Sequence, residues 1–161
     1  MAVALPAGYE WQRGQPRDRA QLLRYLQAGY SEGTASLPPS HLARTLDRFL
    51  SEETPIWWIV TAGDRQIVAG LWLGQSQDQR TGDRQTYIFL VYVEPEHRRR
   101  GLATALLAQA EDWAELQGDR SLSLQVYADN PGAIALYQRA GFCVESLSLS
   151  KPLIRNAASE S

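Results

Sequence analysis

The chain has 161 residues, with 16 Lys and Arg against 18 Asp and Glu and a formal net charge of −2. This length suits one domain with a sizeable core, and the near-neutral charge argues against a nucleic-acid-binding surface. A single cysteine, Cys143, excludes an intramolecular disulfide, and no apolar stretch has the length of a signal or membrane segment, so we expect a cytoplasmic protein with no membrane or metal partner.

Two helices are predicted in the first fifty residues, after a short strand at 9–13. The first spans 17–29, has leucines on one face, and ends near Gly29. A turn-rich segment at 30–38 separates it from the second helix, which Pro39 and Ser40 open and whose apolar side chains recur at helical spacing.

Three apolar, β-prone runs follow, at 56–61, 66–73 and 86–93. Gly63 and Asp64 separate the first two, and the polar stretch 75–85 separates the second from the third. Such runs predict an antiparallel meander with a short and a long hairpin.

The rest of the chain alternates between helix and strand. A helix at about 99–117 ends at Gly118, and a strand at 121–127 leads to a second helix that begins with Asn130 and Pro131. A last strand is predicted from Phe142 to about Leu153, which would bury Cys143 as a structural thiol. We expect one α+β domain at 1–153 with a mixed sheet, and a flexible tail at 154–161.

The turn between the third run and the following helix has the chemistry of a phosphate site. Pro95 ends the strand, three arginines follow, and Gly101 precedes the helix. A helix start offers backbone N–H groups without intrahelical partners and a dipole that favours anions. A diphosphate would fit there, with the arginines as counter-charge.

Two motifs resemble those of the GNAT superfamily of N-acetyltransferases. The first is Arg98-Arg99-Arg100-Gly101-Leu102-Ala103, which is similar to the acetyl-CoA-binding pattern of that family. The second runs from Asn130 through Leu136-Tyr137 to Gly141-Phe142. The resemblance implies a three-layer α/β/α fold, whose central mixed and mostly antiparallel sheet splays between two parallel strands, 86–93 and 121–127.

The resemblance also implies the cofactor contacts. A bulge in the first parallel strand lets the pantetheine arm of acetyl-CoA enter the splay and bond to backbone groups of Val91 and Val93. Asn130 would bond to a pantetheine amide, although helix capping alone would also explain it. The full expected set is Val91, Val93, Arg98, Arg99, Arg100, Gly101, Leu102, Ala103, Asn130, Ala133 and Tyr137.

Tyr137 is the candidate catalytic residue. Attack of an amine on a thioester expels a thiolate, and the family assigns to this tyrosine the task of stabilising or protonating that sulfur. Its spacing with Ala133 and Ala140, taken alone, favours a core aromatic residue, whereas the surrounding Asn130 and Leu136-Tyr137 favour the catalytic role.

No general base is evident. The strand 87–93 holds no acid and no histidine, which departs from many family members. Glu94, Glu96 and His97 are expected to be solvated residues of the turn, and Glu32 is a weak candidate from the acceptor side. Water relaying the proton to backbone or to Tyr92 is an equal alternative.

Trp57 and Trp58 lie on opposite faces of one strand, so one is expected to pack in the core and the other to line the acceptor cleft. Acceptor specificity is expected from residues 27–40 and 75–85, where the sequence shows no pattern that names a substrate.

The resemblance therefore implies an acetyl-CoA-dependent N-acetyltransferase acting on a primary amine, either a small molecule or a protein or peptide N-terminus, as a monomer or homodimer. The alternative is a non-catalytic acetyl-CoA-binding sensor, supported only by the missing acid. An unrelated nucleotide-binding domain is disfavoured, because the chain has no Gly-Lys-Ser/Thr phosphate loop.

Overall fold

The computed structural model describes residues 3–32 and 39–153, and its centre is one sheet of five strands. The strands are ordered β1-β2-β3-β4-β5 in space as in sequence; the first four pair antiparallel, and β4 and β5 pair parallel. Their bounds are β1 Tyr9–Arg13, β2 Ile56–Thr61, β3 Ile67–Gln77, β4 Arg84–Val93 and β5 Leu122–Ser123. This confirms the mixed, mostly antiparallel sheet.

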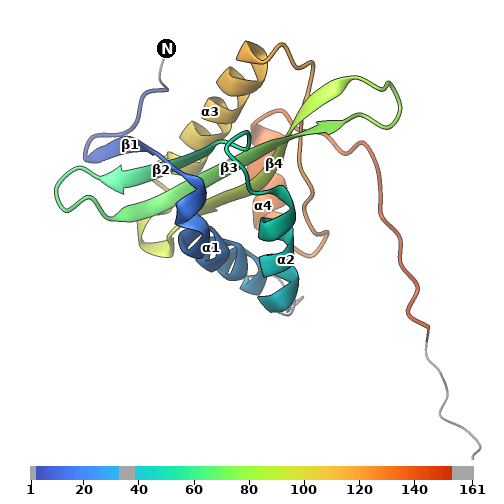
Figure 1. The fold of residues 1–161 in the computed structure, drawn as a ribbon, viewed down its shortest axis with the longest axis horizontal. Coiled ribbons are helices and arrows are strands. Elements are labelled where there is room, and N and C mark those ends of the chain that lie inside the picture. The colour runs from blue at the N-terminus through green and yellow to red at the C-terminus, as the bar shows by residue number, and fades with distance from the viewer. Residues whose placement is uncertain (1–2, 33–38, 154–161) are drawn as a thin grey trace, which may run out of the picture.

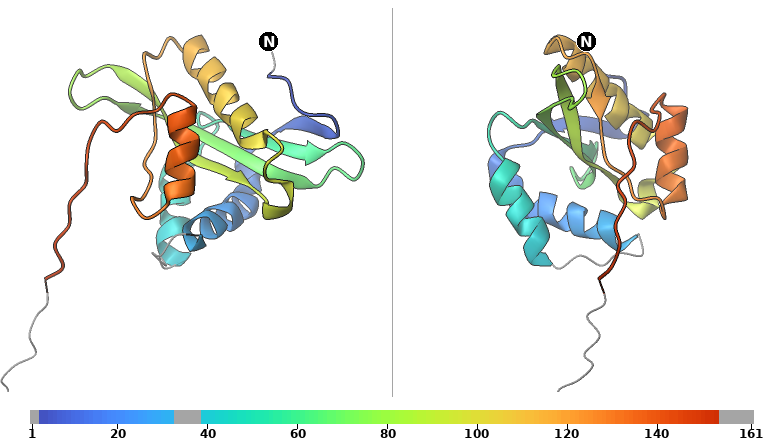
Figure 2. Two further views of the ribbon diagram at one scale, coloured as in Figure 1. Left: turned by 180° about the vertical axis from the view of Figure 1, so that it is seen from behind. Right: turned by 90° about the vertical axis from the view of Figure 1, so that its right-hand side faces the viewer.

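Helices cover both faces of the sheet and give three layers (Figures 1 and 2). On one face α1 (Arg19–Ser31) and α2 (Pro39–Phe49) pack over a core that includes the fully buried Trp58 and Trp72. On the other, α3 (Leu102–Leu116) buries one side against the sheet, and α4 (Pro131–Arg139) lies beside it. Short 3-10 turns occupy Pro16–Asp18 (η1) and Pro95–His97 (η2). No helix in the described ranges is long and apolar enough to cross a membrane.

A bulge in β4 marks the point where the sheet opens. Trp72 pairs with Leu90 and Leu73 pairs with Ile88, so Phe89 is an extra residue on β4. The parallel pairing to β5 is confined to two residue pairs, of which the last joins Tyr87 to Ser123. Beyond that pair, β4 continues to Val93 without β5 beside it. The bulge and the splay that the resemblance implies are both present.

Four local expectations need correction. The long hairpin expected around the polar stretch 75–85 is present, but its strands reach further into that stretch than expected, because residues 75–77 of β3 pair with residues 84–86 of β4 and leave only 78–83 as the turn. β5 is two residues long rather than seven. Residues 142–153 form no strand, and Cys143 is exposed rather than buried. The helix expected from 99 begins at Leu102, since η2 and the arginine turn precede it. The expected loop at 30–38 falls mainly outside the described residues.

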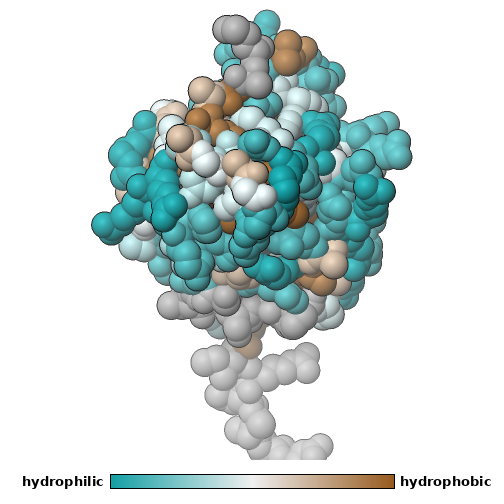
Figure 3. All heavy atoms as spheres, turned by 90° about the vertical axis from the view of Figure 1, so that its left-hand side faces the viewer, coloured by the Kyte–Doolittle hydropathy of each residue, from teal (hydrophilic) through white to brown (hydrophobic). Residues whose placement is uncertain are grey.

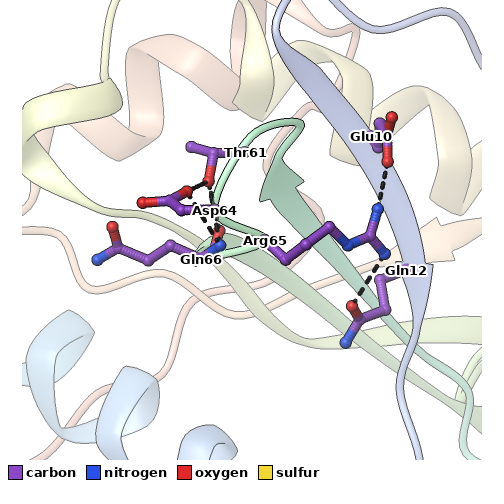
Figure 4. A network of polar contacts seen from close by, with 6 residues as sticks. All are labelled: Glu10, Gln12, Thr61, Asp64, Arg65 and Gln66. Atoms are coloured by element: carbon purple, nitrogen blue, oxygen red, sulfur yellow. Dashed lines mark hydrogen bonds and ion pairs between the residues drawn. The ribbon is translucent and has the colours of Figure 1, made fainter.

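The β2–β3 turn is held by polar side chains, as Figure 4 shows. The hydroxyl of Thr61 bonds to Asp64 and accepts from the backbone N–H of Gln66 at 3.0 Å. Arg65, at φ 59°, reaches across to β1, where it forms an ion pair with Glu10. The surface at this end of the molecule is mainly hydrophilic, with small hydrophobic patches (Figure 3).

Candidate active site

The N-terminus of α3 is an open helix start. Gly101 is its N-cap residue at φ 81°, a left-handed conformation that glycine adopts without steric cost, and no side chain caps the helix there. A β-carbon built on Gly101 would meet no heavy atom within 4 Å. The first N–H groups of α3, beginning at Leu102 and Ala103, are therefore accessible to an anion.

The three arginines before Gly101 have different surroundings. Arg98 donates from Nε to the carbonyl oxygen of Val93 at 2.9 Å and forms an ion pair with Glu32. Arg100 donates from Nη1 to the hydroxyl of Tyr9 at 2.9 Å. Arg99 is exposed, has a left-handed φ of 61°, and makes no ion pair with any described residue. Arg98 thus stabilises the turn, and Arg100 is held to β1 by its hydrogen bond. The guanidinium of Arg99 has the fewest contacts of the three.

His97 is part of the same tether. Its Nδ1 lies 2.8 Å from the Tyr9 hydroxyl, and the two rings meet edge to face at 5.7 Å. The side chain is half-buried, so the expectation of a fully solvated turn residue was wrong for His97. Glu96 is exposed, as expected. The sequence gives no signal for this contact, because Tyr9 and His97 are 88 residues apart.

The outer edge of β4 faces the splay with its backbone. The N–H of Glu94 donates to the carbonyl of Val68 on β3, and successive peptide groups of a strand point to opposite edges. The peptide groups of Val91 and Val93 therefore point away from β3. The carbonyl of Val93 already accepts the Arg98 bond, which leaves its N–H for another partner.

α4 presents the residues of the second motif. Asn130 caps the helix, since its Oδ1 accepts from the N–H of Ala133 at 3.2 Å. That bond uses the Ala133 amide and leaves the Nδ2 donor of Asn130 for another group. Tyr137 is half-buried against the α3-side core and meets Phe142 edge to face at 5.8 Å. Burial raises the pKa of the Tyr137 phenol above its ordinary value, so the phenol stays protonated well beyond neutral pH.

The two best-placed acids are both paired. Glu32 is held by Arg98, and Glu94 forms an ion pair with Arg24. Between them lies Tyr92, whose pKa is raised by burial and then by the charges of Glu32 and Glu94. Each carboxylate is engaged by a guanidinium through Oε1, so neither is an unpaired acid that the structure singles out as a base.

Neither tryptophan of β2 lies at the splay. Trp58 is fully buried on the α1 side and donates from Nε1 to Asp18 at 2.9 Å. Trp57 packs on the other face against Trp113 of α3, and the guanidinium of Arg13 covers its ring at 4.3 Å. β2 is separated from β4 by β3. The expectation that one indole packs in the core is confirmed by Trp58, and neither indole borders the opening between β4 and β5.

Three tyrosines that sequence reasoning did not select meet near the splay. Tyr30, at the end of α1, contacts Tyr127 edge to face at 6.1 Å. Tyr87 of β4 is the third: burial raises the pKa of its phenol, and the nearby Tyr30 raises it further. They lie in segments far apart in the chain, so only the fold brings them together.

Comparison with known proteins identifies the family of the chain. Residues 19–142 match the model of the Acetyltransferase (GNAT) family. The uncharacterized N-acetyltransferase YycN of Bacillus subtilis is 33% identical over 96 residues, 60% of either chain. The [Ribosomal protein bS18]-alanine N-acetyltransferase of Escherichia coli is 44% identical over 55 residues, which are 34% of this chain and 37% of the relative. The matched stretches thus cover less than two thirds of these curated relatives.

Solved structures share the fold over nearly their whole length. A putative acetyl transferase from Pyrococcus furiosus superposes with a TM-score of 0.75 at 20% identity, over 90% of this chain and 99% of the other. An aminoglycoside acetyltransferase from an uncultured soil metagenomic sample gives a TM-score of 0.61 at 24% identity, over 91% and 99%.

Proposed function

The chain belongs to the acetyltransferase (GNAT) family, and we propose that it transfers the acetyl group of acetyl-CoA to a primary amine. The observation that carries the proposal is the uncapped start of α3 at Gly101, directly after three arginines and beside the open edge of β4. This pairs an anion site with an extended backbone edge, which fits a ligand with a diphosphate at one end and an amide-containing arm at the other.

In this proposal the diphosphate lies against the N–H groups of Gly101, Leu102 and Ala103. The absence of a capping side chain and the open space at Gly101 support this fit. Arg99 and Arg100 supply positive charge, with Arg100 oriented by Tyr9. Arg98 acts as a positioning residue, because its guanidinium is bonded to Val93 and Glu32.

The pantetheine arm is assigned to the β4 edge. The outward peptide groups of Val91 and the N–H of Val93 offer strand-like hydrogen bonds, and Asn130 offers its Nδ2 from the other side of the splay. Ala133 contributes its small side chain rather than its capped N–H. When bound, acetyl-CoA supplies an acetyl group activated as a thioester.

Tyr137 is the proposed proton donor to the departing sulfur. A phenol holds its proton at neutral pH at its ordinary pKa of about 10, and burial raises the pKa of Tyr137 further. The N–H of Val91 or Val93 would stabilise negative charge on the carbonyl oxygen during attack. The acceptor amine loses its proton to water, since Glu32 and Glu94 are both held in ion pairs.

The tyrosines near the splay support a cationic acceptor. Tyr30 and Tyr127 meet edge to face and Tyr87 lies nearby, and aromatic rings suit a molecule that is cationic before it reacts. The Escherichia coli relative is named for a protein alanine, and a matched mycothiol acetyltransferase of Beutenbergia cavernae is named for a small molecule. Both a peptide N-terminus and a small amine stay in the proposal.

An acceptor screen tests it. The purified protein is incubated with acetyl-CoA and amines, polyamines, aminoglycosides or N-terminal peptides, and free CoA thiol is measured over a no-acceptor background. We expect acceptor-dependent release with at least one class and a product heavier by one acetyl group by mass spectrometry. Acetyl-CoA binding without release for every class would favour the sensor alternative.

A further inference from the structure

The side chain of Arg100 is exposed but not free. The residue directly precedes Gly101, the N-cap residue of α3. Its Nη1 donates to the hydroxyl of Tyr9 at 2.9 Å, and no other hydrogen bond or ion pair of Arg100 occurs within residues 3–32 and 39–153. A guanidinium has five N–H donors, so the remaining ones stay available to an anion. The single bond to Tyr9 therefore restrains the direction of the side chain without using up its donors.

Tyr9 gives that bond a fixed end. The residue lies in β1, the edge strand opposite β5 (Figure 1), where it pairs with Thr61 of β2. Its ring is half-buried against the α3-side core, and its backbone N–H donates to the carbonyl of Pro6 at 3.3 Å. Strand pairing and packing together fix the position of the hydroxyl, whereas the guanidinium that donates to it is on the surface.

His97 determines the direction of the hydroxyl proton. Its Nδ1 lies 2.8 Å from Oη of Tyr9. Because arginine only donates, Oη accepts from Arg100, and the proton of Oη is left for an acceptor. A neutral imidazole that carries its proton on Nε2 supplies this acceptor at Nδ1. A proton on Nδ1 would instead set two donors against Oη and leave the hydroxyl proton without this partner. The donors therefore run in one direction, from Arg100 through Tyr9 to His97.

Such an arrangement favours anion binding next to Gly101. An arginine that moves freely in the unbound protein loses rotamer freedom when an anion fixes it, and this loss weakens binding. A hydrogen bond that is already present in the unbound protein reduces the loss. Hydrogen bonds in a chain also polarise one another, so donation to His97 makes the Tyr9 oxygen a better acceptor for Arg100.

We propose that Tyr9 and His97 are positioning residues for acetyl-CoA, which hold Arg100 at the start of α3 so that its remaining donors meet the diphosphate. Neither Tyr9 nor His97 touches the ligand; both act through Arg100. This inference rests on the proposed function, because it requires a diphosphate at that helix start.

The first test is a double-mutant cycle between Tyr9 and Arg100, with the dissociation constant of acetyl-CoA measured by titration calorimetry. Tyr9→Phe is expected to weaken binding about three- to tenfold when Arg100 is present. In an Arg100→Met background the same change is expected to have less than about a twofold effect, because no guanidinium is left to position. An equal loss in both backgrounds would mean that Tyr9 contacts acetyl-CoA itself, and would overturn the proposal.

Two substitutions at His97 test the acceptor at the end of the chain. His97→Leu removes it and is expected to raise the dissociation constant, whereas His97→Asn keeps an amide oxygen near the position of Nδ1 and is expected to restore most of the affinity. In steady-state kinetics His97→Leu should raise KM for acetyl-CoA and leave kcat within about twofold, since Arg100 is remote from the reacting atoms. A loss of affinity as large in His97→Asn as in His97→Leu would overturn the role of His97.

Tyr25→Phe is the matched control for Tyr9→Phe. It also removes one hydrogen bond of a tyrosine hydroxyl, the one that Tyr25 donates to the carbonyl of Ile67 at 3.2 Å, but it leaves the Arg100 bond in place. This variant is expected to unfold at a lower temperature and to bind acetyl-CoA as the wild type does. A weakened affinity in Tyr25→Phe equal to that in Tyr9→Phe would trace the effect to stability and contradict positioning.

A measurement without ligand separates this inference from the proposed function. Nitrogen NMR of the free protein is expected to show the Nε2–H tautomer for the imidazole whose signals disappear in His97→Asn, and Tyr9→Phe is expected to shift its tautomer balance. A wild type that binds no acetyl-CoA would overturn the proposed function, and this inference with it. A wild type that binds acetyl-CoA while Tyr9→Phe keeps full affinity, or a free protein whose His97 carries its proton on Nδ1, would overturn this inference alone.

Discussion

The ring of Phe89 lies directly against Gly74 on the neighbouring strand. A β-carbon placed on Gly74 would stand 2.2 Å from Cε2 of Phe89, and the same ring stacks on Trp72 with 4.4 Å between centroids. Phe89 is the extra residue of the β4 bulge. Its ring occupies the space that a side chain at position 74 would fill. The geometry of the splay thus depends on a glycine one strand away.

Gly74→Ala is therefore expected to destabilise the protein by about 1–3 kcal/mol, the usual cost of an overpacked core. Urea unfolding measures it. Gly63→Ala is the control, since a β-carbon there meets nothing within 4 Å, and its effect should stay within about 0.5 kcal/mol. Equal stability of the two variants would show that the Phe89 ring moves aside freely.

If the diphosphate binds at the N-terminus of α3, a glutamate at that end should block acetyl-CoA binding, and a glutamate at the other end should not. Acetyl-CoA should raise the melting temperature of the wild type by mass action, and Gly101→Glu should abolish that rise by placing bulk and negative charge at the helix start. Gly118→Glu is the matched control. Gly118 has a φ of 76° against 81° for Gly101, and its β-carbon position is equally open, so both variants bear similar strain.

Thermal scans with and without acetyl-CoA decide the matter. The shift is expected to persist in Gly118→Glu and to vanish in Gly101→Glu. A shift of the same size in both variants would place the diphosphate elsewhere.

The sequence predicted the parts of this site that are local. The turn at Gly101 and the cap at Asn130 follow from residue types within a few positions of each helix start. The ion pair between Arg98 and Glu32 was not predictable, because the two residues are 66 positions apart and no local sequence pattern indicates the contact. The motifs therefore predicted the kind of ligand that the site binds, while only the fold shows what each arginine contacts.

The same limit explains the errors in the strands. The stretch 75–85 is polar because the hairpin arms protrude, with several side chains exposed, so hydrophobic periodicity misses strands that are stabilised by pairing with each other. Residues 142–153 show the opposite case. Their alternation is typical of a strand, yet a strand also requires backbone pairing, and no described strand pairs with these residues.

Tyr137→Phe is expected to lower turnover by about one to three orders of magnitude while leaving acetyl-CoA affinity unchanged, because the hydroxyl acts mainly in the transition state. The measurement is steady-state thiol release, alongside the acetyl-CoA thermal shift. Unchanged turnover would make Tyr137 a core aromatic residue that contacts Phe142 and nothing more.

No single carboxylate among Glu32, Glu94 and Glu96 is expected to be essential. Replacing each by glutamine should leave turnover within about tenfold of the wild type, whereas removal of a well-placed base costs about a hundredfold or more. The rate should climb with pH toward the pKa of the acceptor amine, about 10 for an alkylamine. A plateau at neutral pH that disappears in Glu32→Gln would identify Glu32 as the base.

Alkaline pH should weaken the fold through Tyr25. Its phenol is fully buried and donates to the carbonyl of Ile67 at 3.2 Å, and burial, followed by the charge of Glu94, raises its pKa above the ordinary value. Above about pH 10 the unfolded chain releases this proton while the folded chain keeps it, so the free energy of unfolding falls as pH rises. Tyr25→Phe should flatten that fall between pH 9 and 11 in urea unfolding. The same slope in both proteins would contradict it.

The weak pairing between β4 and β5 makes this side of the sheet the first to open. β2, β3 and β4 are joined to one another by hairpins and pair over long stretches, while β5 reaches β4 only after the crossover through α3 and holds it by two residue pairs. Local unfolding follows such differences in pairing. Backbone amides of β2 to β4 should exchange with deuterium only on global unfolding, and those of β5 and α4 on a faster, separate opening. β5 and α4, the helix that carries Tyr137, would then be able to detach and close again while the rest of the sheet stays folded.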